Sequence, residues 1–153
     1  MKDITGIKNI SVALSWAVVG AFIPISVSYR NVIQIILIFY FIFIKLFINS
    51  TLFDVRDIKG DRMNGVRTIP VYLGLMKTRK LLIIFNTTLV VWLIYLYSHG
   101  FFHKYLIVLI FNIFFGYWYI LYFCQNGLEI GKSLDLLVDG EWIPTAIIAL
   151  MMS

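Results

Sequence analysis

Three aspartates lie close together in residues 54–62, DVRDIKGDR, between two long apolar runs. Asp54, Asp57 and Asp61 are spaced by three and four residues, so on a continuous helix they would share one face, within roughly 60° of one another. Clustered carboxylates repel one another, and a hard divalent cation relieves that repulsion. Because Mg²⁺ combines a few carboxylates with phosphate oxygens, the segment predicts a Mg²⁺ site for a phosphorylated substrate. The alternative is that Asp–Arg and Asp–Lys pairs only solvate the end of a membrane helix.

The elements that must position this segment are apolar helices with lipid as their solvent. The chain has 153 residues, of which 61% are hydrophobic and 14% charged, and no soluble domain of this length buries so much apolar surface. Runs of about 18–20 apolar residues are long enough to cross a membrane. The sequence predicts an all-α transmembrane bundle of about five spans, at residues 10–29, 31–53, 80–98, 104–124 and 134–151.

Basic residues predict the orientation of these spans. Seven of the thirteen lysines and arginines fall in residues 56–80, and such residues accumulate in cytoplasmic loops. The acidic segment and the N-terminus are therefore expected in the cytoplasm, and the C-terminus outside. The charge of +5 follows from this topology, and no pattern of a nucleic-acid-binding surface is present. The single Cys124 excludes an internal disulfide.

Residues 54–74, DVRDIKGDRMNGVRTIPVYLG, resemble the second aspartate-rich motif of the UbiA superfamily of intramembrane prenyltransferases. That motif runs Asp-x-x-Asp-x-x-x-Asp-Arg, then a Gly, a basic residue with Thr, and an apolar stretch ending in Leu-Gly. The resemblance implies that residues 1–153 form a single membrane domain corresponding to helices five to nine of the nine-helix fold. The superfamily's first motif, Asn-x-x-x-Asp-x-x-x-Asp, is absent from this sequence, so the chain is expected to be a C-terminal half.

The resemblance also implies an activity. In this superfamily two acidic motifs bind Mg²⁺ ions that hold an isoprenyl diphosphate, the allylic C–O bond breaks, and an aromatic or other lipophilic acceptor is prenylated. Carried over by position, Asp54, Asp57 and Asp61 would be the catalytic metal ligands. Arg62 and Arg67 would contact the diphosphate, because guanidinium groups suit bidentate contacts with phosphate.

Two further groups of residues precede the motif on the same predicted helix. Tyr40, Phe43 and Phe47 project onto the same face as Asp54 and are candidates to line an isoprenoid tunnel; packing or lipid contact is the alternative. Lys45 lies within a span, where a lysine is costly. It could reach the interface, pair with a carboxylate of another helix, or contact the diphosphate if the helix bends.

Other interpretations stay open at this point. The chain could be a non-catalytic fragment, a subunit completed by a separately encoded N-terminal half, or one of two copies that face each other. Asp135 and Asp139 could contact the acceptor or form a polar helix entrance, and His99 and His103 fit an interface. A small transporter would place acidic groups near the middle of its spans instead. The expected location is a bacterial or archaeal plasma membrane, with membrane lipid around the chain.

Overall fold

The computed structural model describes residues 6–22, 31–125 and 134–151. Within these ranges the chain contains seven α-helices and no strand, so the predicted all-α class is confirmed. The helices form two compact units, Met1–Gly74 and Leu75–Ser153, and each unit is described by itself.

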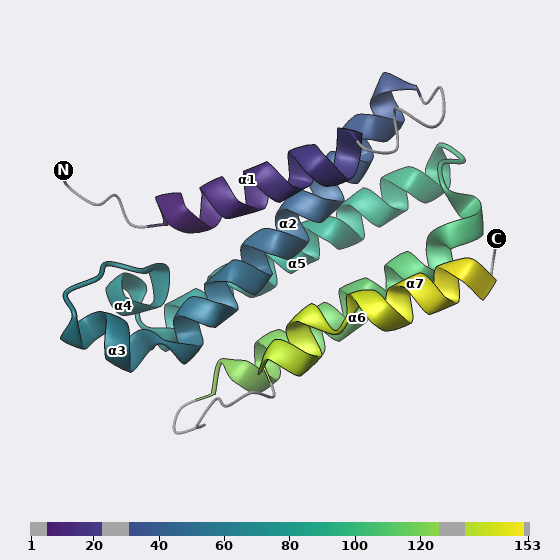
Figure 1. Cartoon of the computed structure of the whole chain (residues 1–153). Coiled ribbons are helices and arrows are strands. Elements are labelled where there is room, and N and C mark those ends of the chain that lie inside the picture. Colours follow the sequence, from purple (N-terminus) through teal and green to yellow (C-terminus); the bar gives the residue numbers. More distant parts are fainter. Residues whose placement is uncertain (1–5, 23–30, 126–133, 152–153) are drawn as a thin grey trace. The chain divides into compact units, whose positions relative to one another are not determined.

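The first unit is built on two antiparallel helices, α1 (Ile7–Phe22) and α2 (Val32–Arg56), which lie side by side in Figure 1. Small residues on α1 allow the close approach: Ala13 and Ala17 are fully buried, and a Cβ on Gly20 would come within 2.7 Å of the Ile42 side chain. Small residues bring apolar helices into contact in lipid, where van der Waals packing drives association. The Asn31 side chain caps the start of α2 by accepting from the backbone N–H of Ile33 at 3.3 Å.

Two short helices, α3 (Ile58–Met63) and α4 (Ile69–Leu73), follow α2. A Schellman turn ends α3: the N–H of Val66 donates to the carbonyl of Asp61 at 2.8 Å, and that of Gly65 donates to Arg62 at 3.4 Å. Gly65 has a φ of 70°, which glycine adopts without a steric cost. The Asn64-Gly65 pair, which is typical of turns, thus forms the turn after α3.

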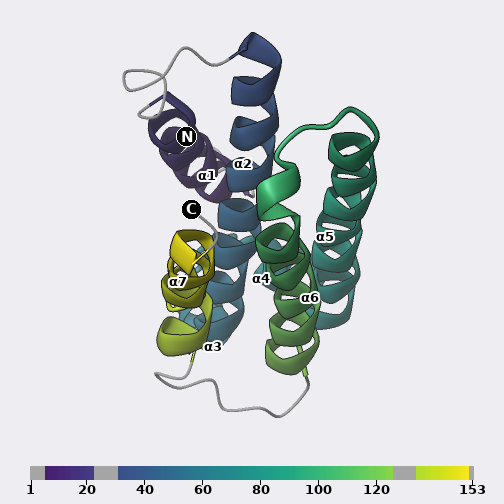
Figure 2. The same ribbon diagram turned by 90° about the vertical axis from the view of Figure 1, so that its right-hand side faces the viewer.

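The second unit begins with α5 (Leu75–Ser98), followed by the 3₁₀ turn η2 (His103–Tyr105) and α6 (Leu106–Phe123). Figure 2 shows α5 and α6 side by side. Buried Asn86 of α5 donates to the carbonyl of Ile113 on α6 at 3.0 Å, and a Cβ on Gly116 would lie 2.6 Å from Asn86 Oδ1. Asn86 of α5 therefore packs against Gly116 of α6, where a larger side chain would clash.

The chain's last described helix is α7 (Trp142–Met151), which packs on α6 and is preceded by a π-helical turn, η3 (Asp135–Asp139). A single helix over 134–151 was predicted, and the structure interrupts it at Gly140. Asn112 of α6 donates to Thr145 Oγ1 of α7 at 3.0 Å. This polar contact fixes the pairing of the two helices.

Three of the described helices are long and apolar enough to cross a membrane: α2, α5 and the segment His103–Phe123. They correspond to the second, third and fourth predicted spans. Helix α1 starts three residues earlier than predicted and has 16 residues in its described part, and residues 23–30 of the first predicted span lie outside the described ranges. Several long apolar helices are consistent with an integral membrane protein.

Candidate functional site: the acidic segment after α2

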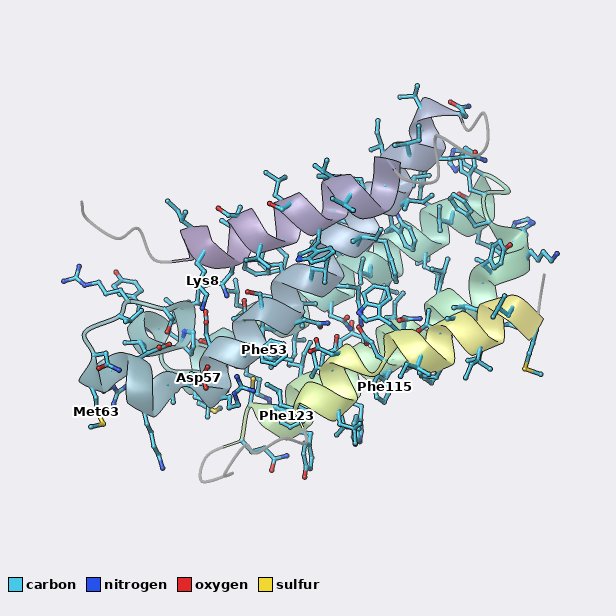
Figure 3. All side chains as sticks on the ribbon, in the orientation of Figure 1. Lys8, Phe53, Asp57, Met63, Phe115 and Phe123 are labelled. Carbon is cyan, nitrogen blue, oxygen red and sulfur yellow. The ribbon has the colours of Figure 1, made fainter. Side chains whose placement is uncertain are left out.

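Asp54 is the most deeply buried of the three aspartates, with its side chain 3% exposed. It lies in the last turns of α2, and both carboxylate oxygens contact α1. Lys8 Nζ lies 3.1 Å from Oδ1, and Asn9 Nδ2 donates to Oδ2 at 2.8 Å. In Figure 3 the side chain of Lys8 extends from α1 toward α2. A buried carboxylate needs a cation and hydrogen-bond donors, and α1 supplies both.

Asn9 also donates to Ser50 Oγ at 3.1 Å. Ser50 precedes Asp54 by one turn, so one buried amide contacts two successive turns of α2. This shows which face of α2 meets α1: it is the face that carries Asp54.

Asp57 lies at the junction between α2 and α3, where the helix is interrupted. Its side chain is 53% exposed, and Arg56 Nε lies 3.0 Å from Asp57 Oδ1. Arg56 also lies over the Phe53 ring, 5.1 Å from its centroid. An exposed pair between neighbouring residues contributes little stability, so this carboxylate is accessible to a ligand.

Asp61 belongs to α3 and differs from the other two aspartates. Its Oδ2 atom is buried and has no hydrogen-bond partner within the described part of the chain. Nearby in sequence, Thr68 is 5% exposed and its hydroxyl is likewise without a partner there. Buried polar atoms are nearly always paired, so these two oxygens are the positions of the segment that most need an additional donor or cation.

The continuous helix assumed for the three aspartates is not present, because the backbone breaks at Asp57. Asp54 therefore faces α1, Asp57 is exposed at the junction, and Asp61 lies on a separate helix. Over the described ranges, no group of three acidic, histidine or cysteine side chains is close enough to hold a metal ion.

The predicted diphosphate ligands Arg62 and Arg67 are both exposed. Arg62 lines a pocket of about 360 Å³ on α3 together with Ile58, Lys59 and Met63. Lys45 is fully buried in α2. Because α2 is uninterrupted between them, Lys45 lies roughly 14 Å from Asp54 along the axis and on the opposite face, so its contact with a diphosphate stays a prediction.

The predicted tunnel residues form part of an aromatic row along α2. The rings of Phe39 and Phe43 are stacked with centroids 6.2 Å apart, and those of Phe43 and Phe47 are 6.4 Å apart. Phe47 is buried, while Phe43 and Tyr40 are partly exposed. The row projects onto the same face of α2 as Ser50 and Asp54. Asn9 of α1 contacts this face near the C-terminal end of α2.

The polar residues of the second unit are more dispersed. The side chain of Asp135 is not among those described, and Asp139 is exposed. His99 stacks on Tyr95 with ring centroids 4.2 Å apart, and His103 lies 5.6 Å from the Tyr97 ring. Their interfacial position therefore stays a prediction.

Cys124 follows α6 and is buried. Burial raises the pKa of its thiol to about 12, against the opposing effect of the Arg79 charge. A thiol of this kind is protonated and unreactive at neutral pH.

Sequence reasoning missed Lys8 and Asn9 as site residues. Both residues lie just before the first predicted span, 10–29, and outside the acidic motif. Their signal was a Lys-Asn pair at the first turn of a membrane helix, where a polar pair is costly without a partner.

The residues present fit a magnesium ion in their chemistry. Three carboxylates offer hard oxygen ligands. One of them, Asp61, has a buried oxygen without a partner in the described part of the chain, and another, Asp57, is exposed. Asp54 would have to release Lys8 from Oδ1 to join them. The three aspartates therefore supply oxygen atoms suited to Mg²⁺. In this structure Lys8 neutralises Asp54 and Arg56 neutralises Asp57.

The helices and this segment define a class: an all-helical protein with long apolar helices and an acidic motif at a helix end. A model of the UbiA prenyltransferase family matches residues 1–136. The chain belongs to this family, as its sequence motif predicted, and membership implies an isoprenyl diphosphate as substrate and, typically, dependence on magnesium. Neither a curated protein nor a solved structure matches the chain.

Proposed function

We propose that the chain forms part of an intramembrane prenyltransferase, which moves an isoprenyl group from a Mg²⁺-bound diphosphate to an aromatic or other lipophilic acceptor. The observation that carries this proposal is the buried oxygen of Asp61, which has no hydrogen-bond partner among the described residues, within a motif that also presents an exposed Asp57. A motif that served only to solvate a helix end would have no need to bury a carboxylate oxygen without a donor.

The three aspartates are proposed to hold the metal, with Asp57 and Asp61 engaged first because Asp54 is paired with Lys8 and Asn9. Exposed Arg62 and Arg67 contact the diphosphate oxygens. When bound, Mg²⁺ neutralises charge that develops on the leaving diphosphate. The family's other acidic motif is absent from residues 1–153 and would be supplied by another segment or polypeptide, or its place taken by a second copy.

The transfer breaks the allylic C–O bond, and the diphosphate leaves with the electron pair. The acceptor's nucleophilic atom donates a pair to the allylic carbon and then loses a proton. Tyr40, Phe43 and Phe47 present ring faces along the path of the isoprenoid chain, which stabilise positive charge on the allylic group. Of the three predicted diphosphate contacts, Lys45 lies furthest from the aspartates, roughly 14 Å from Asp54 along α2.

The basic residues around the acidic segment predict its side of the membrane. With the acidic segment on the cytoplasmic side of a bacterial or archaeal plasma membrane, a water-soluble diphosphate head reaches Arg62 and Arg67 while its tail enters lipid. The basic residues at 56–80 support this orientation.

A non-catalytic role is the second candidate, and one observation favours it. Asp54 and Asp57 already have cationic partners in Lys8 and Arg56, as expected for an ion-pair network that only stabilises a helix end. Such a chain would serve as a subunit for a separately encoded N-terminal half.

The test is Mg²⁺-dependent binding of geranylgeranyl diphosphate to the purified chain in detergent. We expect binding that requires Mg²⁺, is abolished by Asp61→Asn or by Asp54→Asn/Asp57→Asn, and is retained by Asp139→Asn, which removes the same charge outside the motif. Absence of binding in a folded sample, alone and with an added N-terminal half, would support the non-catalytic role.

A further inference from the structure

Lys8 occupies the position next to Asp54 at which a divalent cation would be expected. We propose that Lys8 is a positioning residue: it neutralises Asp54 while the site is empty, yields Oδ1 to the divalent ion on ligand binding, and then contacts the diphosphate. This inference rests on the proposed function and adds to it a residue of α1 that lies outside the acidic motif.

The two contacts to Asp54 differ in how firmly they are held. Asn9 is buried, donates to Oδ2 at 2.8 Å and is anchored by a second bond to Ser50. The Lys8 side chain is 70% exposed and makes its contact with Oδ1 at 3.1 Å. Oδ2 is therefore fixed and Oδ1 is held by a flexible chain that can move away.

The physical reason for exchange is competition between cations for one oxygen. The Lys8 ammonium is a mobile point charge on a flexible stem, and its 70% exposure lets solvent screen its attraction to buried Asp54. A divalent ion, in contrast, also gains phosphate ligands. The displaced ammonium remains within reach of the site. A diphosphate that arrives with the metal offers it a new anionic partner, so Lys8 would be exchanged between two anions without leaving the site.

This arrangement predicts two effects of opposite sign when Lys8 is removed. Without a competing ammonium, the metal binds more tightly. Without a cationic contact, the diphosphate binds more weakly when metal is saturating. If Lys8 only held α1 against α2, its removal would instead weaken the binding of both the metal and the diphosphate, because the site would lose its shape.

The experiment uses the full chain in detergent with Mn²⁺ as the probe, because its electron paramagnetic resonance signal reports free and bound ion. Geranylgeranyl diphosphate binding is then measured by equilibrium dialysis at saturating Mn²⁺. For Lys8→Met we expect Mn²⁺ affinity to rise roughly three- to tenfold and diphosphate affinity to fall by a similar factor. Lys8→Arg keeps the charge and should stay close to the natural chain in both assays.

Lys80→Met is the matched control, since it removes an exposed lysine of α5 that lies outside the acidic segment. Equal effects of Lys80→Met and Lys8→Met would show that only net charge matters and would overturn the proposal. So would unchanged or uniformly weaker binding in Lys8→Met. If the natural chain and Asp61→Asn both fail to bind Mn²⁺, the proposed function itself fails; normal binding that Lys8→Met leaves unaltered refutes only the role of Lys8.

Discussion

Replacing Asn9 with leucine removes the amide that joins α1 to two turns of α2. Asn9 Nδ2 donates to Asp54 Oδ2 at 2.8 Å and to Ser50 Oγ at 3.1 Å. After the substitution, a carboxylate oxygen with almost no access to solvent loses its donor, and among the polar contacts of the described residues the one with exposed Lys8 remains. We expect Asn9→Leu to destabilise the first unit.

The magnitude follows from the two contacts. A hydrogen bond to a charged group contributes about 1.5–3 kcal/mol and a neutral one about 1 kcal/mol. Added apolar surface on leucine offsets part of this, so the expected loss is about 2–4 kcal/mol. For a chain of this size each 1 kcal/mol lowers the midpoint of thermal unfolding by about 2–4 °C, which gives a fall of roughly 5–15 °C.

The assay is thermal unfolding in detergent, followed by tryptophan fluorescence. A double-mutant cycle with Asp54→Leu isolates the contact, and we expect a coupling free energy of about 1–2 kcal/mol between positions 9 and 54. Ser11→Leu, at an exposed position of α1, controls for the added apolar bulk. A midpoint for Asn9→Leu that matches Ser11→Leu, or a coupling near zero, would refute the reasoning.

Three further outcomes are expected in the second unit. Gly116→Ala should displace buried Asn86, break its bond to Ile113 and lower the unfolding midpoint by several degrees, about 1–3 kcal/mol, whereas Gly116→Ala combined with Asn86→Ala should recover part of the loss. Thr145→Val should remove the hydroxyl bonded to Asn112 and cost about 0.6–1.7 kcal/mol by the same assay; no change would mean that the contact contributes nothing. Since burial raises the pKa of Cys124 to about 12, its thiolate fraction at pH 8 is on the order of a thousandfold lower than in the unfolded chain, and iodoacetamide should label it only on denaturation. Because only the unfolded chain ionises this thiol above a pH of about 9, the free energy of unfolding should fall as the pH rises from about 9 toward 12.

Continuous apolar runs were enough to predict α2, α5 and the segment that contains α6, because a helix in lipid needs only length and hydrophobicity. The ends of the helices were harder. Residues 54–79 were expected to be one long connection, yet α2 extends to Arg56 and α5 begins at Leu75. Lysine and arginine at 77, 79 and 80 are good helix formers, so their charge was a misleading sign of a loop. The helices are instead interrupted at Asp57, over residues 64–68 and at Gly74.

The motif predicts which side chains would carry the chemistry, but it did not predict how they are arranged. Placing the three aspartates on one face assumed an unbroken helix, and the break at Asp57 depends on backbone geometry that a spacing does not encode. The contacts of Lys8 and Asn9 with Asp54 join positions 46 and 45 residues apart. Only the packing of α1 on α2 brings them together, so the local Lys-Asn pair could suggest a polar partner but could not identify it as Asp54.

An acidic site that must bind a metal and a diphosphate also has to remain folded before either arrives. Three uncompensated carboxylates at a membrane helix end would repel one another and destabilise it. Here Lys8, whose side chain is 70% exposed, neutralises buried Asp54, and Arg56 neutralises Asp57, which is 53% exposed. In each pair one partner is open to solvent, which screens the attraction, so a divalent ion would be able to replace the cation. Within the described residues the buried oxygen of Asp61 has no such partner, so on the proposed function metal capture should begin at this carboxylate.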